Sequence, residues 1–555
     1  MAFTWSSCYL KHTQLKNLGN CVIICHMNKT TKIIRLKRTN FLESIFDNYG
    51  YFCEHIPPCF NTKNFGKFLN LKYDSIHCCY SANDAITFPL EITIAKDGLL
   101  RREIYMPHIV SYIEVIKYIE NNFELIFDRI KNKHSESKAN ILVPFDYHSF
   151  YRKSIKNRNT WFSGAKYKLK LDISNCFNSI YTHSIAWAFL KKEKAKLMHA
   201  NKITKSPIYN IADGLDYRIR MMKGNETNGI LTGPYTSRLI SELIFAACDK
   251  DLEHIGLNFT RYVDDYNFYF NTETELKNSL SNIANILNRF NFRINENKIK
   301  IEKSPFDTID NLEESFNDIF SISNNPVYAI LQEASKLVMD GKKGAFKYAF
   351  KYLYKKKIDK MDDKVLVFSY IVSIVVNYPF LSCYAIPLLD KLKVFFDPYD
   401  DTKKLNRLLK NEISANHDQE VLWLLFIMIR YESKITVENI CDILDGKNDL
   451  AIIMVLDIIN NHRIYIREYD KKKEEYDRKI EKHIIKLSNA LKDEGMYTKR
   501  WLLKYEIAYR KFKFNKVLKN TNMIKNPVYK IFKSNKIDFY DFPGDPDLVD
   551  TSIYI

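Results

Sequence analysis

Two adjacent aspartates, Asp264 and Asp265, lie between two short apolar stretches, and this arrangement constrains the fold more than any other feature of the sequence. The segment from Phe259 to Phe270 is predicted to form two short strands that are joined at Val263-Asp264-Asp265. Aspartate is common in turns, so an Asp-Asp turn alone is weak evidence of function. Two carboxylates fixed side by side nevertheless repel each other unless a cation lies between them. The turn is therefore a candidate metal site.

The residues on either side of this turn predict further strands and helices. The stretch from Tyr167 to Ile173 alternates apolar with charged residues, which indicates a strand with one apolar and one charged face. Apolar residues recur at helical spacing from Leu239 to Ala247 and from Leu276 to Phe290. Short strand pieces are expected at Phe292–Ile294 and Ile299–Ile301. The order strand, helix, hairpin, helix, strand is close to the split βαβ arrangement of polymerase palms.

A third carboxylate, that of Asp172, lies near the end of the 167–173 strand and is expected beside Asp264 and Asp265. Two-metal phosphoryl transfer needs carboxylates that hold two Mg²⁺ ions about 3.5–4 Å apart. One ion activates a 3′ hydroxyl and the other stabilises the leaving pyrophosphate. We therefore expect these three aspartates to bind two Mg²⁺ ions and to be the catalytic residues.

The length and charge of the chain indicate a multidomain protein with a polyanionic partner. Its 555 residues exceed the size of a single hydrophobic core, which predicts two or three domains. The net charge of +18 favours nucleic acid as the partner, although a Lys- and Asn-rich proteome explains the charge equally well. We expect an N-terminal extension at 1–26, a fingers-like region at 27–140, a palm at 141–305 and an α-helical repeat-like domain at 325–555. The boundary is expected in Asp307–Asn325, and translation is expected to start at Met1 or Met27.

One stretch is long enough to be tested as a membrane span. Val365 to Leu389 contains 25 residues without a charge. Asn377-Tyr378-Pro379 and Pro387 interrupt it, and the uninterrupted piece Val365–Val376 has only 12 residues. A buried helix followed by a turn is the better explanation, so no membrane partner is expected. The eleven cysteines contain no CxxC pair, which favours free thiols in the cytoplasm.

Four motifs in a fixed order give the chain a recognisable pattern between residues 140 and 305. Leu169 to Phe177 resembles motif A of the reverse transcriptases, and Gly229 to Ser237 (GILTGPYTS) resembles motif B. Tyr262 to Asp265 matches motif C, and Asn295 to Lys300 (NENKIK) resembles motif D. The chain thus resembles a reverse transcriptase. This resemblance also implies that Asp172, Asp264 and Asp265 are the metal ligands.

The resemblance implies roles for two further residues near the aspartates. Phe177 lies five residues after Asp172, where the family places an aromatic ring that crowds the 2′ position of the sugar. This position implies a preference for deoxynucleotides, whereas the alternative is an ordinary core phenylalanine. Lys298 lies near the motif D lysine, which protonates the leaving pyrophosphate, and the alternative is a solvated surface lysine.

Motif B and the upstream region supply the remaining nucleotide-binding candidates. Reverse transcriptases commonly carry Pro-Gln-Gly in motif B, whereas this chain has Leu231-Thr232-Gly233. The missing glutamine puts ordinary template handling in doubt, while Gly233 and Ser237 are retained. Arg152, followed by Lys156 and Arg158, lies where a fingers element binds the triphosphate, although a basic surface facing nucleic acid explains it equally well.

The sequence outside the motifs narrows the resemblance to one branch. Asn178 to Ile185, Gly233 to Glu242 and Glu54 to Phe60 resemble the AbiK-like antiphage reverse transcriptases of bacteria, which act in abortive infection. The implied fold is an α+β reverse-transcriptase palm and fingers followed by an all-α helical-repeat-like C-terminal domain. Apolar helix patterns at Val421 to Ile429 and Ala451 to Ile459 agree with that expectation. The resemblance implies a bacterial cytoplasmic protein that uses dNTPs, and it allows a homo-oligomer.

The same branch implies a DNA polymerase that extends a protein hydroxyl without copying a template. The priming residue is not fixed by the sequence, and Tyr49 and Tyr51 are only guesses from the upstream region. One alternative is a conventional RNA-templated reverse transcriptase of a mobile element. Another is a nucleic-acid-binding scaffold with an inactive polymerase fold, or a ribonuclease that uses the R-x4-H pair Arg478 and His483. A solvated, charged helix explains that pair better.

Overall fold

The computed structural model extends over the whole 555-residue chain. Most of the extension predicted at 1–26 lies outside the described residues, and so does Met27. The described residues are 23–25, 31–33, 37–47, 51–53, 55–63, 65–81, 86–96, 100–136, 162, 164–201, 206–306, 312–342, 344–356, 364–392, 400–460, 469–492, 494–510, 512 and 526–542.

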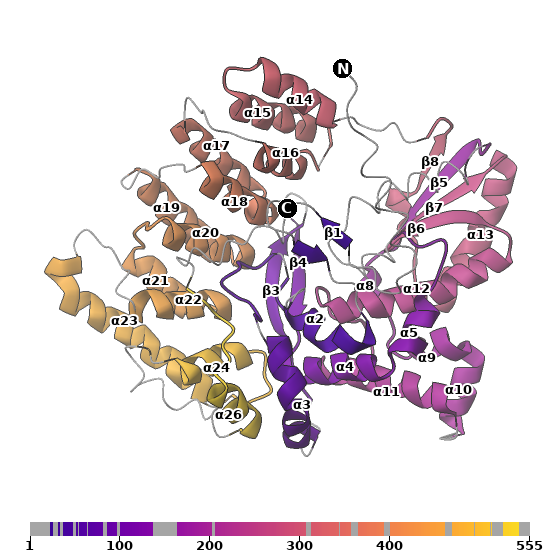
Figure 1. Ribbon diagram of the computed structural model, residues 1–555, viewed down its shortest axis with the longest axis horizontal. Helices are drawn as coiled ribbons and strands as arrows, with labels where there is room; N and C mark the ends of the chain where they lie inside the picture. The colour runs from indigo at the N-terminus through magenta and orange to yellow at the C-terminus, as the bar shows by residue number, and fades with distance from the viewer. Residues whose placement is uncertain are drawn as a thin grey trace.

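The N-terminal region consists of helices and two small antiparallel sheets (Figure 1). One sheet pairs β1 with β2, and the other is a hairpin of β3 and β4 in which Leu90 pairs with Met106 and Ala95 with Arg101. In β3 every second residue is buried, so the hairpin has an apolar face. The elements are β1 (Ile23–Cys25), β2 (Thr31–Ile33), η2 (Arg38–Asn40), α2 (Phe41–Asp47), α3 (Phe65–Ser81), β3 (Leu90–Ala95), β4 (Arg101–Met106), α4 (Ile109–Asn121) and α5 (Phe123–Ile130).

The central region contains a four-stranded antiparallel sheet in the order β6-β7-β5-β8. Helix α13 packs on β5 and β7 and also contacts α12. The Thr272 hydroxyl caps the start of α13 by accepting from the amide of Glu275 at 3.2 Å. The elements are β5 (Tyr167–Asp172), α8 (Cys176–Ser179), α9 (Ser184–Leu190), α10 (Lys192–Ala200), α11 (Pro207–Met221), α12 (Tyr235–His254), β6 (Asn258–Tyr262), β7 (Asp265–Phe270), α13 (Glu273–Arg289), η3 (Glu296–Lys298) and β8 (Lys300–Lys303).

The predicted order of strand, helix, hairpin, helix and strand is confirmed, with α8 to α11 inserted between β5 and α12. Two details of the prediction were wrong. The segment 292–294 forms no strand, only an isolated bridge between Ile294 and Ile173. Lys168 was expected on an exposed charged face but is 1% exposed, because β8 covers it and Glu302 pairs with its ammonium group at 2.8 Å. A neighbouring strand can thus bury a residue that alternation places toward solvent.

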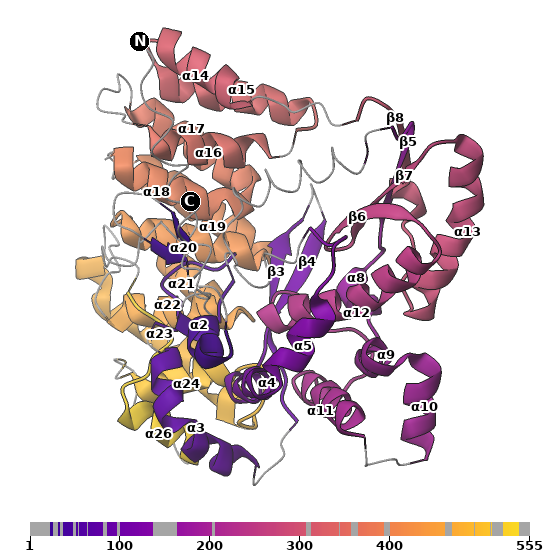
Figure 2. The same ribbon diagram turned by 45° about the vertical axis from the view of Figure 1, so that its right-hand side comes forward.

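The C-terminal helices, called here the C-terminal array (Leu312–Ser534), stack beside the N-terminal region (Figures 1 and 2). Successive helices pack on one another, as α14 does on α15, α15 on α16 and α20 on α22. The elements are α14 (Leu312–Ile322), α15 (Pro326–Met339), α16 (Ala345–Lys355), α17 (Lys364–Asn377), η4 (Pro379–Leu381), α18 (Ser382–Leu392), α19 (Asp400–Ser414), α20 (Asp418–Arg430), α21 (Val437–Leu444), α22 (Asp449–Asn460), α23 (Tyr469–Lys492), α24 (Trp501–Tyr509) and α26 (Pro527–Ser534).

Two expectations about this array are corrected. The stretch predicted as a boundary, 307–325, contains α14, whose Phe316 packs edge-on against Tyr352 of α16. That part of the stretch therefore belongs to the array. Pro387 was expected to interrupt the apolar segment, but it lies inside α18. The predicted helix is confirmed as α17, but only one of its faces is buried, because Val365 and Leu366 are 59% and 40% exposed. Among the described residues no helix has the length and apolarity to cross a bilayer.

A buried aromatic cluster joins the N-terminal region to the end of the array. His108 is fully buried between Trp501 and Tyr529, whose hydroxyl lies 2.8 Å from its Nε2. Burial lowers the pKa of His108 to about 3, so the imidazole is neutral at physiological pH. Helix α26 also packs on α3. The two ends of the chain therefore share one core.

Candidate active site

The Asp264-Asp265 turn connects β6 to β7 and is held in a strained conformation. Val263 has φ = +56°, which is unfavourable for a β-branched residue. The turn is supported from below by Arg261, whose guanidinium donates to the Val263 carbonyl at 2.9 Å. That guanidinium is itself buried and paired with Glu242 at 2.9 Å and Asp249 at 2.7 Å. A buried ionic cluster therefore fixes the backbone that presents the two aspartates.

The third predicted carboxylate lies directly opposite this turn. Asp172 at the end of β5 pairs in register with Asp265 at the start of β7. Asn295 donates to the Asp172 carboxylate at 3.2 Å, and the Lys298 ammonium lies 3.1 Å from it. The structure thus brings together Asp172, Asp264, Asp265 and Lys298, which the sequence placed in one site. Asn295 was not predicted as a site residue, although it opens the motif D segment.

The electrostatics of the three aspartates fit a divalent cation. The pKa of Asp265 is raised to about 6, first by burial and then by the negative charges of Asp264 and Asp172. The pKa of Asp264 is also raised, mainly by burial, while the positive charges of Lys298 and Arg102 oppose the shift. Oxygen donors crowded in this way are the ligands that Mg²⁺ prefers. The donor set therefore fits the predicted metal, which would relieve the repulsion that raises these pKa values.

These residues line a pocket of about 880 Å³ that also receives Phe177 from α8. The opposite wall is formed by the β3–β4 hairpin, which contributes Lys96, Arg101 and Arg102; we call it the basic hairpin. Glu103 of the same hairpin also lines the pocket, so the hairpin's cations exceed its carboxylates there by two, and the charge of Arg102 acts on Asp264. A net positive charge beside three carboxylates is what a site for a metal-bound triphosphate requires. Sequence reasoning missed these residues because the hairpin lies outside the four motifs. The cluster Leu100-Arg101-Arg102 between two strand patterns was the available signal.

The array holds this hairpin through three consecutive residues at the start of α20. Asp418 accepts from the Thr93 amide at 2.9 Å, and Gln419 accepts from the Ala95 amide at 3.1 Å. Glu420 forms a two-point ion pair with Arg101, in which one contact is 2.8 Å. We call Asp418–Glu420 the clasp. It connects residues more than 300 positions apart, so the array fixes one wall of the pocket.

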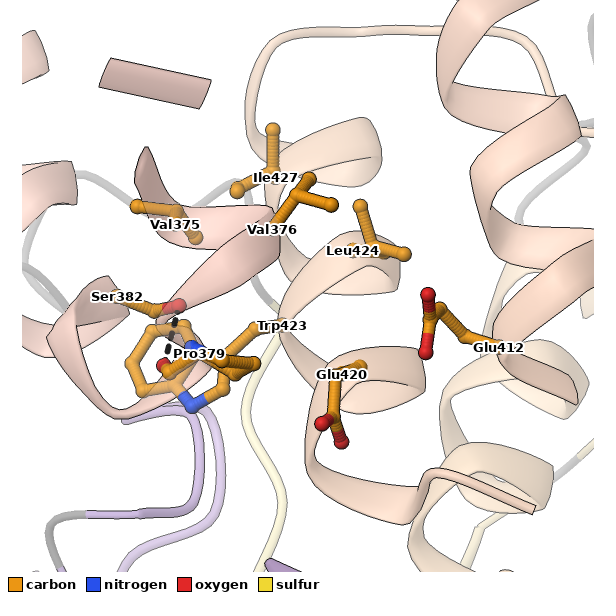
Figure 3. A pocket seen from close by; sticks show the side chains of 9 residues that line it. All are labelled: Val375, Val376, Pro379, Ser382, Glu412, Glu420, Trp423, Leu424 and Ile427. Atoms are coloured by element: carbon orange, nitrogen blue, oxygen red, sulfur yellow. Dashed lines mark hydrogen bonds between the residues drawn. The ribbon is translucent and has the colours of Figure 1, made fainter. Parts of the chain in front are cut away.

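A small pocket lies behind the clasp, lined by Glu412 and Glu420 together with apolar residues of α17 and α20 (Figure 3). The two carboxylates lie at one side of it, away from Val375. Ligand atoms of Glu412, His417 and Glu420 lie within 4.8 Å of one another. His417 is already bound to Glu412 at 2.6 Å and Glu420 to Arg101, so these groups satisfy one another.

Comparison with known proteins decides the class of the central region. Residues 124–313 match the sequence model of the family described as reverse transcriptase (RNA-dependent DNA polymerase). The chain contains a reverse-transcriptase domain. The match includes Asp172, Asp264 and Asp265 and all four predicted motifs. A domain of this kind belongs to a nucleotidyltransferase, and the antiphage branch of the family remains a proposal.

Solved telomerase structures show a distant likeness. The apo telomerase of Candida tropicalis truncated from its C-terminal domain is 13% identical over 44% of this chain and 56% of that chain, with a TM-score of 0.29. Telomerase of Candida albicans in complex with a TWJ fragment of telomeric RNA is 13% identical over 66% and 69%, with a TM-score of 0.26. The chain thus spans little more than half of the first structure. No curated protein sequence matches the chain significantly.

Within the reverse-transcriptase domain, motif B contacts the basic hairpin. The Thr232 carbonyl accepts from the Tyr105 amide at 2.8 Å. Gly233 has φ = +118°, and a side chain there would approach the Tyr105 carbonyl at 3.3 Å. This glycine is therefore required for the close contact between hairpin and motif. Ser237, predicted to bind nucleotide, is 3% exposed inside α12 and outside the pocket lining.

The remaining predicted residues contribute little to this site. Arg152, Lys156, Arg158 and Tyr49 lie outside the described residues. Tyr51 is buried, and its hydroxyl donates to the Pro107 carbonyl. Its hydroxyl is therefore not accessible, which speaks against Tyr51 as the priming residue. In the R-x4-H pair, His483 contacts Asp445 at 3.1 Å and Arg478 donates to the Glu474 carbonyl of its own helix. Arg478 therefore contacts its own helix α23 and His483 contacts the end of α21, as expected for a charged helix.

Proposed function

We propose that this protein is an antiphage DNA polymerase of bacteria that adds deoxynucleotides to a hydroxyl of its own chain without copying a template. The observation that carries the polymerase part is the set of three carboxylates from β5 and the β6–β7 turn, which face the basic hairpin across one pocket. Mg²⁺ bound to Asp172, Asp264 and Asp265 would activate the attacking hydroxyl and stabilise the leaving pyrophosphate.

Each wall of the pocket has a separate task in this proposal. The cationic side chains of Lys96, Arg101 and Arg102 would bind the triphosphate, since opposite charges attract strongly in a partly desolvated site. Lys298 carries a proton at Nζ beside Asp172, where it is available to the leaving group. Phe177 would fill the space that a 2′ hydroxyl needs, which favours deoxynucleotides.

Protein priming is supported by the departure at Thr232 and by the tyrosines near the carboxylates. Among the described residues, Tyr105 and Tyr262 line the pocket. Burial and the neighbouring Glu103 raise the pKa of Tyr105, which makes its hydroxyl a poorer nucleophile. Tyr262 is 41% exposed and directly precedes the catalytic turn, so it is the better candidate. Tyr49 remains a candidate priming residue on the basis of the sequence alone.

The test is to incubate the purified full-length protein with Mg²⁺ and each labelled dNTP, without template or primer. Label is expected to stay with the polypeptide after boiling in detergent and to be released by protease. The D264N/D265N variant should give no label, because it loses the metal-binding charge at nearly constant volume. Tyr262→Phe and Tyr49→Phe then identify the attachment site.

Two results separate the alternatives. DNA that migrates freely and appears only when an RNA template is added would favour an RNA-templated reverse transcriptase, which the description of the matching family suggests. Incorporation by wild type that does not exceed that of D264N/D265N would eliminate the polymerase proposal, and absence of label from both would leave a nucleic-acid-binding scaffold.

A further inference from the structure

A histidine and two glutamates lie together where α19 ends and α20 begins. Ligand atoms of Glu412, His417 and Glu420 lie within 4.8 Å of one another. The turn between the helices holds two of these residues, because the His417 amide donates to the Glu412 carbonyl at 3.0 Å and Asn416 adopts φ = +56°. His417 directly precedes α20, and Glu420 lies in the first turn of that helix. The backbone therefore fixes the three side chains relative to one another.

The hydrogen bonds of these side chains are satisfied, but their charges are not balanced. The carboxylates of Glu412, Asp418 and Glu420 lie close together at this turn. Of the three, only Glu420 forms an ion pair with an arginine or lysine of the described residues, and its partner is Arg101. With His417 counted as neutral, three carboxylates and one guanidinium leave two negative charges, in a place where Glu412 and Glu420 are only 18% and 8% exposed. A divalent cation would balance them.

The donor set favours Zn²⁺ over the Mg²⁺ expected at the catalytic aspartates. Mg²⁺ takes oxygen ligands, whereas an imidazole nitrogen beside two carboxylates is a donor set that Zn²⁺ accepts. Zn²⁺ with three protein ligands binds a water as the fourth. A cavity of about 20 Å³, enough for one water molecule, adjoins Glu412 and Glu420 (Figure 3). Glu420 can bind the ion without leaving Arg101, because each carboxylate oxygen has two lone pairs.

Small side-chain rotations are enough to close this site around an ion. Ligands that bind a tetrahedral Zn²⁺ at about 2.0–2.2 Å lie roughly 3.4 Å from one another, and the three donor atoms already lie within 4.8 Å. His417 is 36% exposed, so its ring can turn and the ion can reach it from solvent. We propose that Glu412, His417 and Glu420 bind a Zn²⁺ ion that fixes the clasp on the basic hairpin. This site is separate from the carboxylates of the proposed polymerase, so the inference does not depend on the proposed reaction.

The test measures Zn²⁺ binding in the presence of Mg²⁺. Full-length D264N/D265N protein is freed of metal with a chelator, dialysed, and titrated with Zn²⁺ in a calorimeter at saturating Mg²⁺, so that the catalytic site does not contribute. Loss of a group that only orients a metal ligand costs about 10–100-fold in affinity, so loss of a ligand should cost at least about 100-fold. H417Q and E412Q, each in this background, should weaken the tightest Zn²⁺ site by that factor. Both substitutions leave the ion pair of Glu420 with Arg101 in place.

A histidine on another helix supplies the matched control. His483 of α23 contacts Asp445 at 3.1 Å, but Lys486 also contacts that carboxylate at 3.0 Å and neutralises it. H483Q in the same background should therefore bind Zn²⁺ as tightly as the background protein. Equal losses in H417Q and H483Q, or an affinity that H417Q leaves unchanged, would overturn the proposal.

A second measurement follows the clasp itself. Two backbone amides of β3 donate to the clasp, so an ion that fixes the start of α20 should slow hydrogen exchange in peptides from Leu90–Ala95. Zn²⁺ should slow this exchange in the background protein and leave it unchanged in H417Q. Slowing that persists in H417Q, or its absence from both proteins, would show that no ion at this site holds the clasp. Because the background protein lacks two of the catalytic carboxylates, these results stand apart from success or failure of the proposed polymerase.

Discussion

Replacing Arg261 with methionine tests whether the buried ionic cluster holds the catalytic turn. The Arg261 side chain is 0% exposed, and its partners Glu242 and Asp249 are 3% and 1% exposed. Methionine keeps much of the volume but leaves two buried carboxylates without their cation. Breaking a buried pair in this way costs about 3–5 kcal/mol. The Val263 carbonyl also loses its donor, so a backbone conformation strained by about 1–3 kcal/mol loses its support.

The loss of folding stability in R261M should increase as the pH rises. Burial already raises the pKa of Asp249, and removal of the guanidinium, which lowers it, should raise it further. A carboxyl with a folded-state pKa above its unfolded value binds protons in the folded protein, so stability is greater at low pH and is lost as pH rises through the folded pKa. The penalty in R261M should therefore be larger at pH 8 than at pH 5.

Two measurements check this reasoning. Hydrogen exchange of peptides from the Asn258–Phe270 hairpin should be faster in R261M, and the denaturant midpoint should fall. The matched control is Lys277→Met, which breaks an exposed pair with Glu273 and should cost no more than about 0.5 kcal/mol. A loss in R261M as small as that of the control, or one that shrinks with rising pH, would refute the argument.

Three further predictions concern the pocket. Phe177→Ala should let ribonucleotides compete, lowering the preference for dATP over ATP by about tenfold or more, and unchanged selection in competition assays would rule out a role at the 2′ position. Glu420→Gln removes the charge that fixes Arg101 and should raise the KM for dNTPs about tenfold with a smaller change in kcat, whereas a lower KM would show that Glu420 restrains the arginine. Because the metal-free pKa of Asp265 is about 6, protons compete with Mg²⁺ for this carboxylate below that pH. The Mg²⁺ dissociation constant measured by calorimetry should therefore rise as the pH falls from 7 to 5. A constant value would contradict the assignment of Asp265 as a metal ligand.

The sequence was sufficient to predict the features that depend on local patterns. Asp172, Asp264 and Asp265 each stand at a strand end whose apolar alternation is visible in the chain, and the structure places Asp172 opposite Asp265 in register. Long-range partners could not be predicted in the same way. The pairing of Arg101 with Glu420 depends on how a helical array folds back onto a hairpin, and no spacing in the sequence encodes it. Lys168 was misplaced for the same reason, since its burial depends on β8.

The clasp has a consequence for the selection of nucleotides. Polymerases whose nucleotide-binding hairpin swings inward can inspect a substrate twice, once on entry and once on closure, and induced fit of this kind raises discrimination. Here α20 fastens the hairpin through two backbone amides and one arginine. We expect such an anchored wall to inspect each incoming nucleotide once, by charge and shape alone. The enzyme should then distinguish sugars at Phe177 far better than it distinguishes one base from another, and its products should be correspondingly random in sequence.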